Sequence, residues 1–201
     1  MALCSDITIL IPAAGASTRM RGQDKLLMDV DGQPMIAHQT KVALATGKPV
    51  FVTLPTGHSK RATALENLKC ASLQVLPVQK ASEGIAASLR TGVAAARDAS
   101  ALMVVLADMP CLTTEDLNIL ITAHQASPST IFRAASPTGK PGHPTIIPSR
   151  LFDAVFTLSG DEGAKSLLRR QDVTLVPLAD DRATLDLDTP EDWNSWHQGK
   201  N

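Results

Sequence analysis

Short, mostly apolar runs alternate with longer segments of helical periodicity along this chain. The apolar runs, each of which predicts a strand, occupy residues 7–12, 49–54, 73–78, 101–107, 173–178 and 183–188. Segments with apolar positions three or four residues apart, which predict helices, occupy residues 34–45, 59–69, 83–98, 113–125, 163–171 and 189–196. This alternation predicts an α/β fold of three layers, with a mostly parallel sheet and helices on both of its faces.

Three features add detail to this pattern. The run ALMVVLA at 101–107 is the most continuous, which is typical of a central strand that helices cover on both faces. Residues 133–149 are rich in Gly, Pro and Ser, so we expect a loop there that feeds a strand outside the regular alternation. Thr113 and Asp116 have capping-box spacing, which predicts a helix beginning at Thr113.

Composition mainly excludes classes of partner. Hydrophobic residues make up 44% of the 201 residues, and the formal net charge is -1, so nothing favours nucleic acid or a membrane surface as a partner. No apolar run approaches the ~20 residues that a membrane span needs, and no basic segment precedes the apolar start as in a signal peptide. The three cysteines form no metal-spaced pair, which indicates reduced thiols and a cytoplasmic protein. We expect a single domain over residues 1–201.

A basic loop of small residues follows the first predicted strand. Gly15, with Ala13 and Ala14 beside it, would let backbone N–H groups approach anionic oxygens, and Arg19 and Lys25 would add positive charge. The loop is neither a Walker A loop nor a dinucleotide fingerprint, because the required glycine and lysine pattern is missing. By itself the loop is equally well explained as a surface loop with solvated charges.

Carboxylates follow two later predicted strands. Asp108 comes directly after 101–107, at the carboxyl end of a strand where ligands bind in such sheets. It suits Mg²⁺, which takes one or two carboxylates together with phosphate oxygens, whereas Thr113 is the better helix cap. Asp186 and Asp188 are two residues apart, so on a strand they would face the same side and either could share the metal. Alone they would be solvated acids; with the basic loop they indicate metal-assisted phosphate chemistry.

Six stretches resemble, in order, the motifs of the MobA-like nucleotidyltransferases, and most closely the branch of molybdenum cofactor cytidylyltransferases. The stretches are PAAGASTRMRGQDKLL, ASEGIAASLRTGV, LADMPCLTTEDL, KPGHPTIIPS, LSGDEGAKSLLRR and LDLDTPEDW, and the likeness runs from residue 8 to residue 193. The first and last stretches are typical of the whole superfamily, whereas EGIAASLR, GHP and SGDEGA are typical of the branch. The resemblance implies a Rossmann-like nucleotidyltransferase fold.

The resemblance also implies an activity. A cytidylyl group would move from CTP to the terminal phosphate of a molybdopterin-type cofactor with release of pyrophosphate, in a Mg²⁺-dependent reaction. The AAG form of the first motif favours CTP over GTP. A recipient molybdoenzyme or its chaperone is a further candidate partner.

Residue roles follow from the same resemblance. Ala13, Ala14 and Gly15 would contact the nucleotide, and Arg19 and Lys25 would hold the triphosphate. Ser88 would lie near the base and His143 towards the acceptor, although a lone loop histidine is more often a surface residue. Asp108 would bind Mg²⁺, with Asp186 or Asp188 completing the site. The DxGTPE motif of related sugar nucleotidyltransferases aligns with Asp186 and slightly favours it.

Three other activities remain open at this point. One is guanylyl or sugar-nucleotide transfer on the same fold. A second is an NAD(P)-dependent oxidoreductase on this scaffold, although the glycine fingerprint that would support it is absent. A third is a non-catalytic protein that delivers a cofactor to a partner enzyme, against which Lys25 and Asp108 argue.

Overall fold

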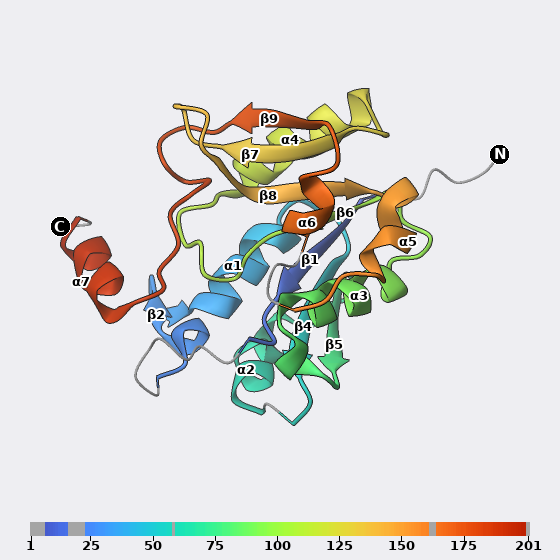
Figure 1. The fold of residues 1–201 in the computed structure, drawn as a ribbon. Helices are drawn as coiled ribbons and strands as arrows, with labels where there is room; N and C mark the ends of the chain where they lie inside the picture. Colours follow the sequence, from blue (N-terminus) through green and yellow to red (C-terminus); the bar gives the residue numbers. More distant parts are fainter. Residues whose placement is uncertain (1–6, 16–22, 58, 161–163, 200–201) are drawn as a thin grey trace.

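The computed structural model describes residues 7–15, 23–57, 59–160 and 164–199, and a seven-stranded sheet forms its centre (Figure 1). The strands are β1 (Thr8–Pro12), β4 (Val50–Pro55), β5 (Leu73–Val78), β6 (Ala101–Val104), β7 (Ile131–Ala135), β8 (Pro141–Pro148) and β9 (Val173–Pro177). They lie in the order β5-β4-β1-β6-β8-β7-β9. Strand β8 runs antiparallel to both neighbours, whereas the other described pairings in this sheet are parallel. The predicted mostly parallel sheet is confirmed, with β6 at its centre.

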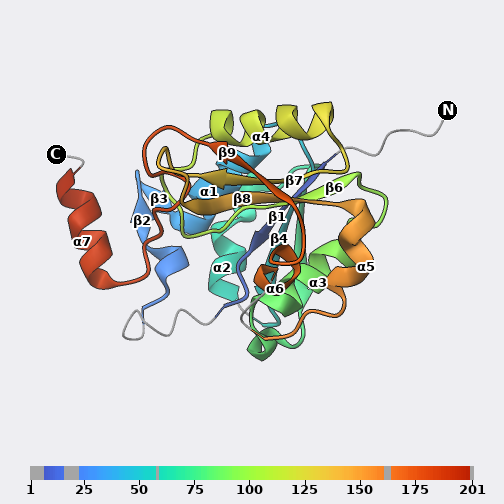
Figure 2. The same cartoon turned by 45° about the horizontal axis from the view of Figure 1, so that its top comes forward.

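Helices cover both faces of the sheet, which confirms the three predicted layers. Their bounds are α1 (Met35–Leu44), α2 (Ser59–Ala64), α3 (Ile85–Ala95), α4 (Thr114–Ala126), α5 (Phe152–Val155), α6 (Lys165–Leu168) and α7 (Pro190–Gly199). Helices α1, α2 and α4 pack into one hydrophobic core, and α3, α5 and α6 into the other. Figure 2 shows α4 and α3 on opposite sides of the sheet. None of the described helices has both the length and the hydrophobicity to cross a membrane.

The burial of β1 shows why its residues form a doubly covered strand. Successive strand residues point to opposite faces. Ile9 and Ile11 therefore enter the core beneath α1 and α4, whereas Leu10 enters the core beneath α3. Gly92 of α3 lies directly over Leu10, because a Cβ at Gly92 would come within 2.5 Å of Leu10 Cδ2. The missing side chain thus allows the helix to approach the strand.

The segment predicted as a loop at 133–149 is largely a hairpin. Strands β7 and β8 pair antiparallel, and the connection between them is confined to residues 136–140. Strand β8 is the expected strand outside the regular alternation. Its register with β7 shifts between Arg133 and Ala135, beside Pro144, and such irregularities are where a sheet tolerates proline. The many Gly, Pro and Ser residues therefore suggested a loop where the chain in fact forms an irregular strand.

The predicted strand at 183–188 is wrong. The chain instead crosses the ends of β8 and β6 there. The N–H of His143 donates to the carbonyl oxygen of Ala183 (2.8 Å). The N–H of Leu187 donates to the carbonyl oxygen of Asp108 (3.1 Å). Asp186 and Asp188 therefore do not share a strand face. Figure 1 shows this stretch descending from β9 to α7 on the side toward which β1, β7 and β9 point.

Shorter departures concern the helices. The predicted helix at 59–69 ends at Ala64 and continues as a separate 3₁₀ turn, η3 (Glu66–Leu68). A 3₁₀ turn, η4 (Ala81–Glu83), precedes α3. The capping box of Thr113 and Asp116 is present at the start of α4, so Asp108 has no capping role.

We expect Gly142→Ala to lower the free energy of unfolding by about 1–3 kcal/mol, the usual cost of overpacking. A Cβ at Gly142 would lie 1.7 Å from the carbonyl oxygen of Ala183, and this obstacle is backbone rather than a flexible side chain. Chemical denaturation measures the loss. Gly15→Ala is the matched control, because a Cβ at Gly15 would meet nothing within 4 Å. Equal stability of Gly142→Ala and the wild type would contradict this close approach.

Candidate active site

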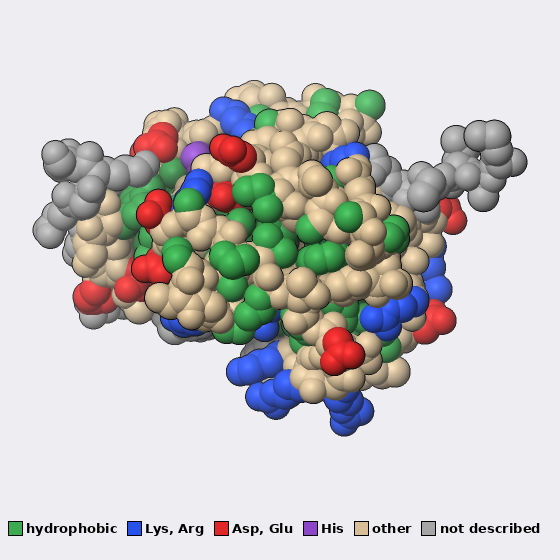
Figure 3. All heavy atoms as spheres, turned by 90° about the horizontal axis from the view of Figure 1, so that it is seen from above, with side chains coloured by type: hydrophobic (Ala, Val, Ile, Leu, Met, Phe, Trp, Pro, Cys, Tyr) green, Lys and Arg blue, Asp and Glu red, His purple; other side chains and the backbone are tan. Residues whose placement is uncertain are grey.

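The side chains of Lys25, Asp108 and Asp188 meet at the edge of the sheet where β6 ends. Lys25 begins the 3₁₀ turn η2 (Lys25–Leu27), Asp108 lies just beyond β6, and Asp188 lies just before α7. Nζ of Lys25 lies 2.5 Å from Oδ2 of Asp108 and 2.5 Å from Oδ1 of Asp188. The three side chains are 16%, 17% and 20% exposed, so they are sheltered but remain within reach of a ligand. In Figure 3, which views the molecule from above, acidic side chains, a basic side chain and a histidine gather on the left of the face shown.

The charges in this cluster depend on one another. Burial acts to lower the pKa of Lys25, but the charges and hydrogen bonds of Asp108 and Asp188 outweigh it, so the pKa is raised. The pKa of Asp186 is also raised, by partial desolvation of its carboxyl group and then by the negative charges of Asp188 and Asp108. Carboxylates that converge in this way need a cation, and Lys25 supplies one positive charge.

Arg61 of α2 connects η2 to the loop after β1. Its Nε and Nη2 donate to the two carboxylate oxygens of Asp24, each at 2.7 Å, and Asp24 is the N-cap of η2. Its Nη1 donates to the carbonyl oxygens of Ala13 (2.6 Å) and Gly15 (2.8 Å). Arg61 is 2% exposed. A buried two-pronged contact of this kind fixes orientation as well as distance, so Arg61 sets the position of the loop relative to Lys25.

Sequence reasoning missed Arg61, because a single arginine in a predicted helix is normally a solvated charge. The available signal was its spacing of one helical turn from Leu65, which is buried on the core face of the same segment. That spacing places Arg61 on the buried side of α2.

The loop after β1 offers fewer backbone donors than predicted. The N–H of Ala13 donates to the carbonyl of Thr53 (3.0 Å), so Ala13 extends the sheet and cannot offer this group to a phosphate. The described residues provide no acceptor for the N–H groups of Ala14 and Gly15. Space also lies open in front of Gly15, where a Cβ would meet nothing within 4 Å. The predicted anion cradle thus retains the donors of Ala14 and Gly15, while Arg19 lies outside the described residues.

Ser88 lies in the first turns of α3, beside the loop. Its neighbour Ala87 packs with Ala14 in a small apolar cluster, so the start of α3 borders the loop as expected. The side chain of Ser88 is itself buried. Its contact with a nucleotide base stays a prediction.

The structure brings His143 towards Asp108. Burial and then the charge of Arg133 lower the pKa of His143 to about 4, while a hydrogen bond with the Val104 backbone and the charge of Asp108 act in the opposite direction. The imidazole is therefore neutral at neutral pH. Its Nδ1 is buried and has no hydrogen-bond partner in the described part of the chain. Arg133 of β7, which the sequence did not single out, is its charged neighbour.

Asp108 and Asp188 are the carboxylates that could hold a metal. Among the described residues, no group of three or more His, Cys, Asp or Glu side chains has the arrangement of a complete protein metal site. Asp108 and Asp188 converge on a common cation, Lys25 Nζ, whereas Asp186 is exposed and contributes its charge from outside this contact. Two converging carboxylates suit Mg²⁺, which usually completes its ligand set with phosphate oxygens and water.

Comparisons with known proteins agree on one family. Residues 9–175 match the family model described as the MobA-like NTP transferase domain. The nicotine blue oxidoreductase of Paenarthrobacter nicotinovorans is 29% identical, covering 92% of this chain and 93% of its own length. The purine catabolism protein PucB of Bacillus subtilis (strain 168) is 31% identical, covering 90% of this chain and 91% of its own length.

Solved structures match over the same extent. The crystal structure of Rv0371c from Mycobacterium tuberculosis H37Rv has a TM-score of 0.80 at 26% identity, covering 97% of this chain and 99% of that chain. A structure of Rv0371c in complex with manganese has a TM-score of 0.75 at 25% identity, covering 95% and 97%. The similarity therefore extends over nearly the whole chain, and the second of these structures is a complex with manganese.

We expect Arg61→Met to lower the free energy of unfolding by about 3–5 kcal/mol, because removing one partner of a buried ion pair leaves the other charge uncompensated. Chemical denaturation measures this loss. Lys60→Met changes an exposed cation in the same helix and serves as the control. A loss as small as that of Lys60→Met would mean that Arg61 does not hold the loop and η2 together.

We expect Asp188→Asn to weaken Mn²⁺ binding more than Asp186→Asn does. Asp188 and Asp108 both accept a hydrogen bond from Nζ of Lys25, whereas Asp186 makes no such contact. The loss for Asp188→Asn should be at least about tenfold, since even outer-shell partners of a metal typically cost that much. Calorimetric titration with MnCl₂ measures both affinities. A larger loss for Asp186→Asn would reverse the assignment.

Proposed function

The chain belongs to the MobA-like NTP transferase domain family, and on that premise we propose that it transfers CMP from CTP to the terminal phosphate of a molybdopterin-type cofactor. Pyrophosphate is the second product. The observation that carries the proposal is the ammonium group of Lys25, held between Asp108 and Asp188 at the carboxyl edge of the sheet. A recipient molybdoenzyme or its chaperone would be the partner that takes the product.

The chemistry demands charge neutralisation more than a protein nucleophile. An oxygen of the acceptor phosphate attacks the α-phosphorus of CTP in line, and the bond to pyrophosphate breaks. Both reactants are anions, and a phosphate acceptor is already ionised at neutral pH, so no general base is required. Lys25 and the N–H groups of Ala14 and Gly15 are the described donors available for the triphosphate. Their fixed position beside the leaving group is what accelerates the reaction.

The carboxylates of Asp108 and Asp188 would hold Mg²⁺. Nucleotidyltransferases of this kind usually use a divalent metal, and the manganese complex of Rv0371c supports the same for this chain. When bound, Mg²⁺ polarises phosphate oxygens and offsets their charge. Lys25 keeps the two carboxylates together, so that they are already placed for the cation.

The relatives leave one competing class of activity. The name of the Paenarthrobacter nicotinovorans protein states an oxidoreductase, whereas that of PucB states a role in purine catabolism. Transfer to a phosphate is favoured here because two carboxylates converge on a lysine beside a loop with free backbone donors. Hydride transfer itself does not require a pair of carboxylates that could hold a divalent metal.

Pyrophosphate release tests the proposal. The protein is incubated with Mg²⁺, a molybdopterin-type acceptor and CTP, GTP, ATP or UTP in turn, and we expect release from CTP only when the acceptor is present. Release from GTP, or with sugar phosphates as acceptors, would assign a different transfer reaction. Oxidation of NAD(P)H without pyrophosphate would assign the oxidoreductase class, and no turnover at all would favour a delivery protein.

Lys25→Ala separates the role of Lys25 in the reaction from a role in binding. We expect its single-turnover rate to fall by roughly a hundredfold or more, the scale seen when one preorganised stabiliser of charge is removed. CTP affinity, measured by calorimetry, should weaken much less, because the backbone donors and Mg²⁺ remain. Lys41→Ala, which removes an exposed lysine from α1, is the control. Equal losses in rate and affinity would mean that Lys25 acts on the bound ground state.

A further inference from the structure

Arg133 of β7 is a half-buried arginine that has no acidic partner among the described residues. Its Nε donates to the carbonyl oxygen of Gly142 at 2.8 Å. The described chain provides no acceptor for the N–H groups on its Nη1 and Nη2. Burial lowers the pKa of Arg133, which indicates that its guanidinium has lost hydration without gaining a counter-charge.

Two other polar groups beside Arg133 also lack partners. Thr145 of β8 lies directly opposite Arg133, and His143 follows Gly142, whose carbonyl oxygen accepts from Nε of Arg133, so the three residues lie close together. Oγ1 of Thr145 and Nδ1 of His143 are buried, and neither has a hydrogen-bond partner in the described structure. Buried polar groups are normally hydrogen-bonded, so these unused hydrogen-bonding atoms, gathered beside Arg133, indicate a place for a ligand.

The cluster lies next to the candidate active site. Arg133, Thr145 and Val104 form one row across β7, β8 and β6, and Val104 is the last residue of β6. The contact with Gly142 carries the guanidinium beyond this row, toward the same edge of the sheet as Asp108. The influence of Asp108 on His143 agrees with this placement.

A purely structural role leaves most of this arrangement unexplained. Holding the carbonyl of Gly142 takes one donor, which a smaller polar side chain could supply. The remaining N–H groups of the guanidinium lie in one plane and can donate to two oxygens at once, which matches the oxygens of a phosphate group. The neutral imidazole of His143 adds no competing charge, so the local potential at Arg133 favours an anion.

We propose that Arg133 and Thr145 form a second phosphate subsite, separate from the triphosphate cradle of Ala14, Gly15 and Lys25, and that it holds the phosphate monoester of the acceptor. The proposal rests on the proposed transfer reaction for the role of that ligand. The guanidinium binds oxygens of the acceptor phosphate that do not attack, and the hydroxyl of Thr145 donates one further hydrogen bond. The acceptor is thereby held across the sheet edge from the nucleotide.

Titration with inorganic phosphate tests the subsite without turnover. The wild type, Arg133→Gln and Arg133→Lys are first saturated with CTP and Mg²⁺ in the absence of acceptor, so that the triphosphate cradle is filled, and calorimetry then gives the phosphate affinity. We expect Arg133→Gln to lose about tenfold or more in phosphate affinity, the scale of a lost charged hydrogen bond. Arg133→Lys should recover part of the loss, because it keeps the charge without the two-pronged donors.

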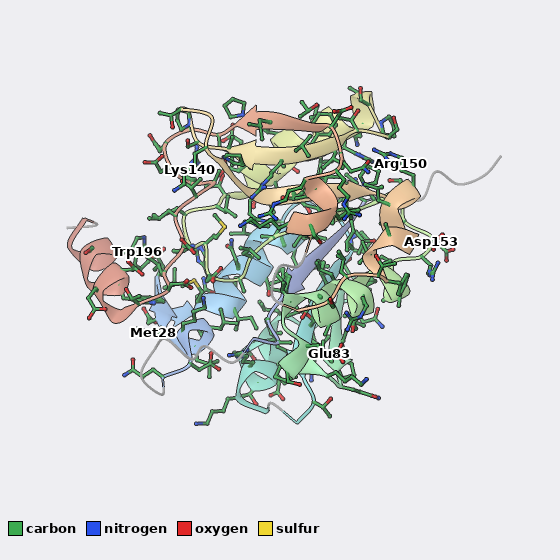
Figure 4. All side chains as sticks on the ribbon, in the orientation of Figure 1. Met28, Glu83, Lys140, Arg150, Asp153 and Trp196 are labelled. Atoms are coloured by element: carbon green, nitrogen blue, oxygen red, sulfur yellow. The ribbon has the colours of Figure 1, made fainter. Side chains whose placement is uncertain are left out.

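Lys140→Gln is the matched control for net charge. Lys140 lies at the turn between β7 and β8, where Figure 4 labels it, and its side chain is exposed. This variant should bind phosphate as the wild type does, and thermal unfolding checks that each variant is folded. Unchanged phosphate affinity in folded Arg133→Gln overturns the proposal, as does an equal loss in Lys140→Gln.

CTP affinity shows whether Arg133 binds the triphosphate of CTP or a separate phosphate group. If Arg133→Gln weakens CTP binding as much as it weakens phosphate binding, Arg133 belongs to the triphosphate cradle and the separate subsite is refuted. Failure of the transfer reaction is a different result: pyrophosphate release would then be absent in the wild type, while Arg133-dependent binding of phosphate persists.

Discussion

The ammonium group of Lys25 holds together three parts of the chain that are distant in sequence. Asp108 is 83 residues and Asp188 is 163 residues away from it, yet each carboxylate lies within 2.5 Å of Nζ. Two carboxylates at that separation repel each other strongly unless a cation lies between them. The end of β6, the 3₁₀ turn η2 and the stretch before α7 therefore meet at one positive charge. The same requirement makes the place suitable for phosphates and a divalent metal.

Two packing features keep this meeting point in place. The buried guanidinium of Arg61 contacts Asp24 on one side and the carbonyls of Ala13 and Gly15 on the other, so the loop and η2 cannot move independently. Gly142 has no side chain where the backbone of Ala183 crosses it. This close approach lets the segment after β9 pass over the strand ends and deliver Asp188. The site thus depends on the hydrogen bonds of Arg61 and on the absence of a side chain at Gly142.

Positive charge is divided between two places along the edge of the sheet. Lys25 is paired with carboxylates, whereas Arg133 is half-buried beside the neutral imidazole of His143 and has no described acidic partner. A reaction between two anionic phosphates needs both of them neutralised and separately oriented. The first place suits a nucleoside triphosphate with its metal, and the second suits the phosphate of an acceptor. In the proposed transfer reaction, this division would let a protein with a net charge of -1 bring two anions together.

The hydrophobic pattern was sufficient to determine the layers of the fold and the position of Asp108 at the end of a strand. Apolar runs and helical periodicity depend on local spacing, so a linear chain reveals them, and polar residues after such runs fall at strand ends. The alternation at 183–188 resembled a strand but is a crossing segment, because the steric access at Gly142 and the bond to Ala183 are tertiary contacts.

The tertiary structure alone decided the partners of individual charges. It selected Asp188 rather than Asp186 for the contact with Lys25, tied the N–H of Ala13 into the sheet, and buried Arg61 beneath the loop. It also placed Arg133 beside His143 through the pairing of β7 with β8. The physical reason is the same throughout: burial and hydrogen-bond pairing depend on distances between segments that are remote in sequence, whereas amphipathic pattern depends only on neighbours along the chain.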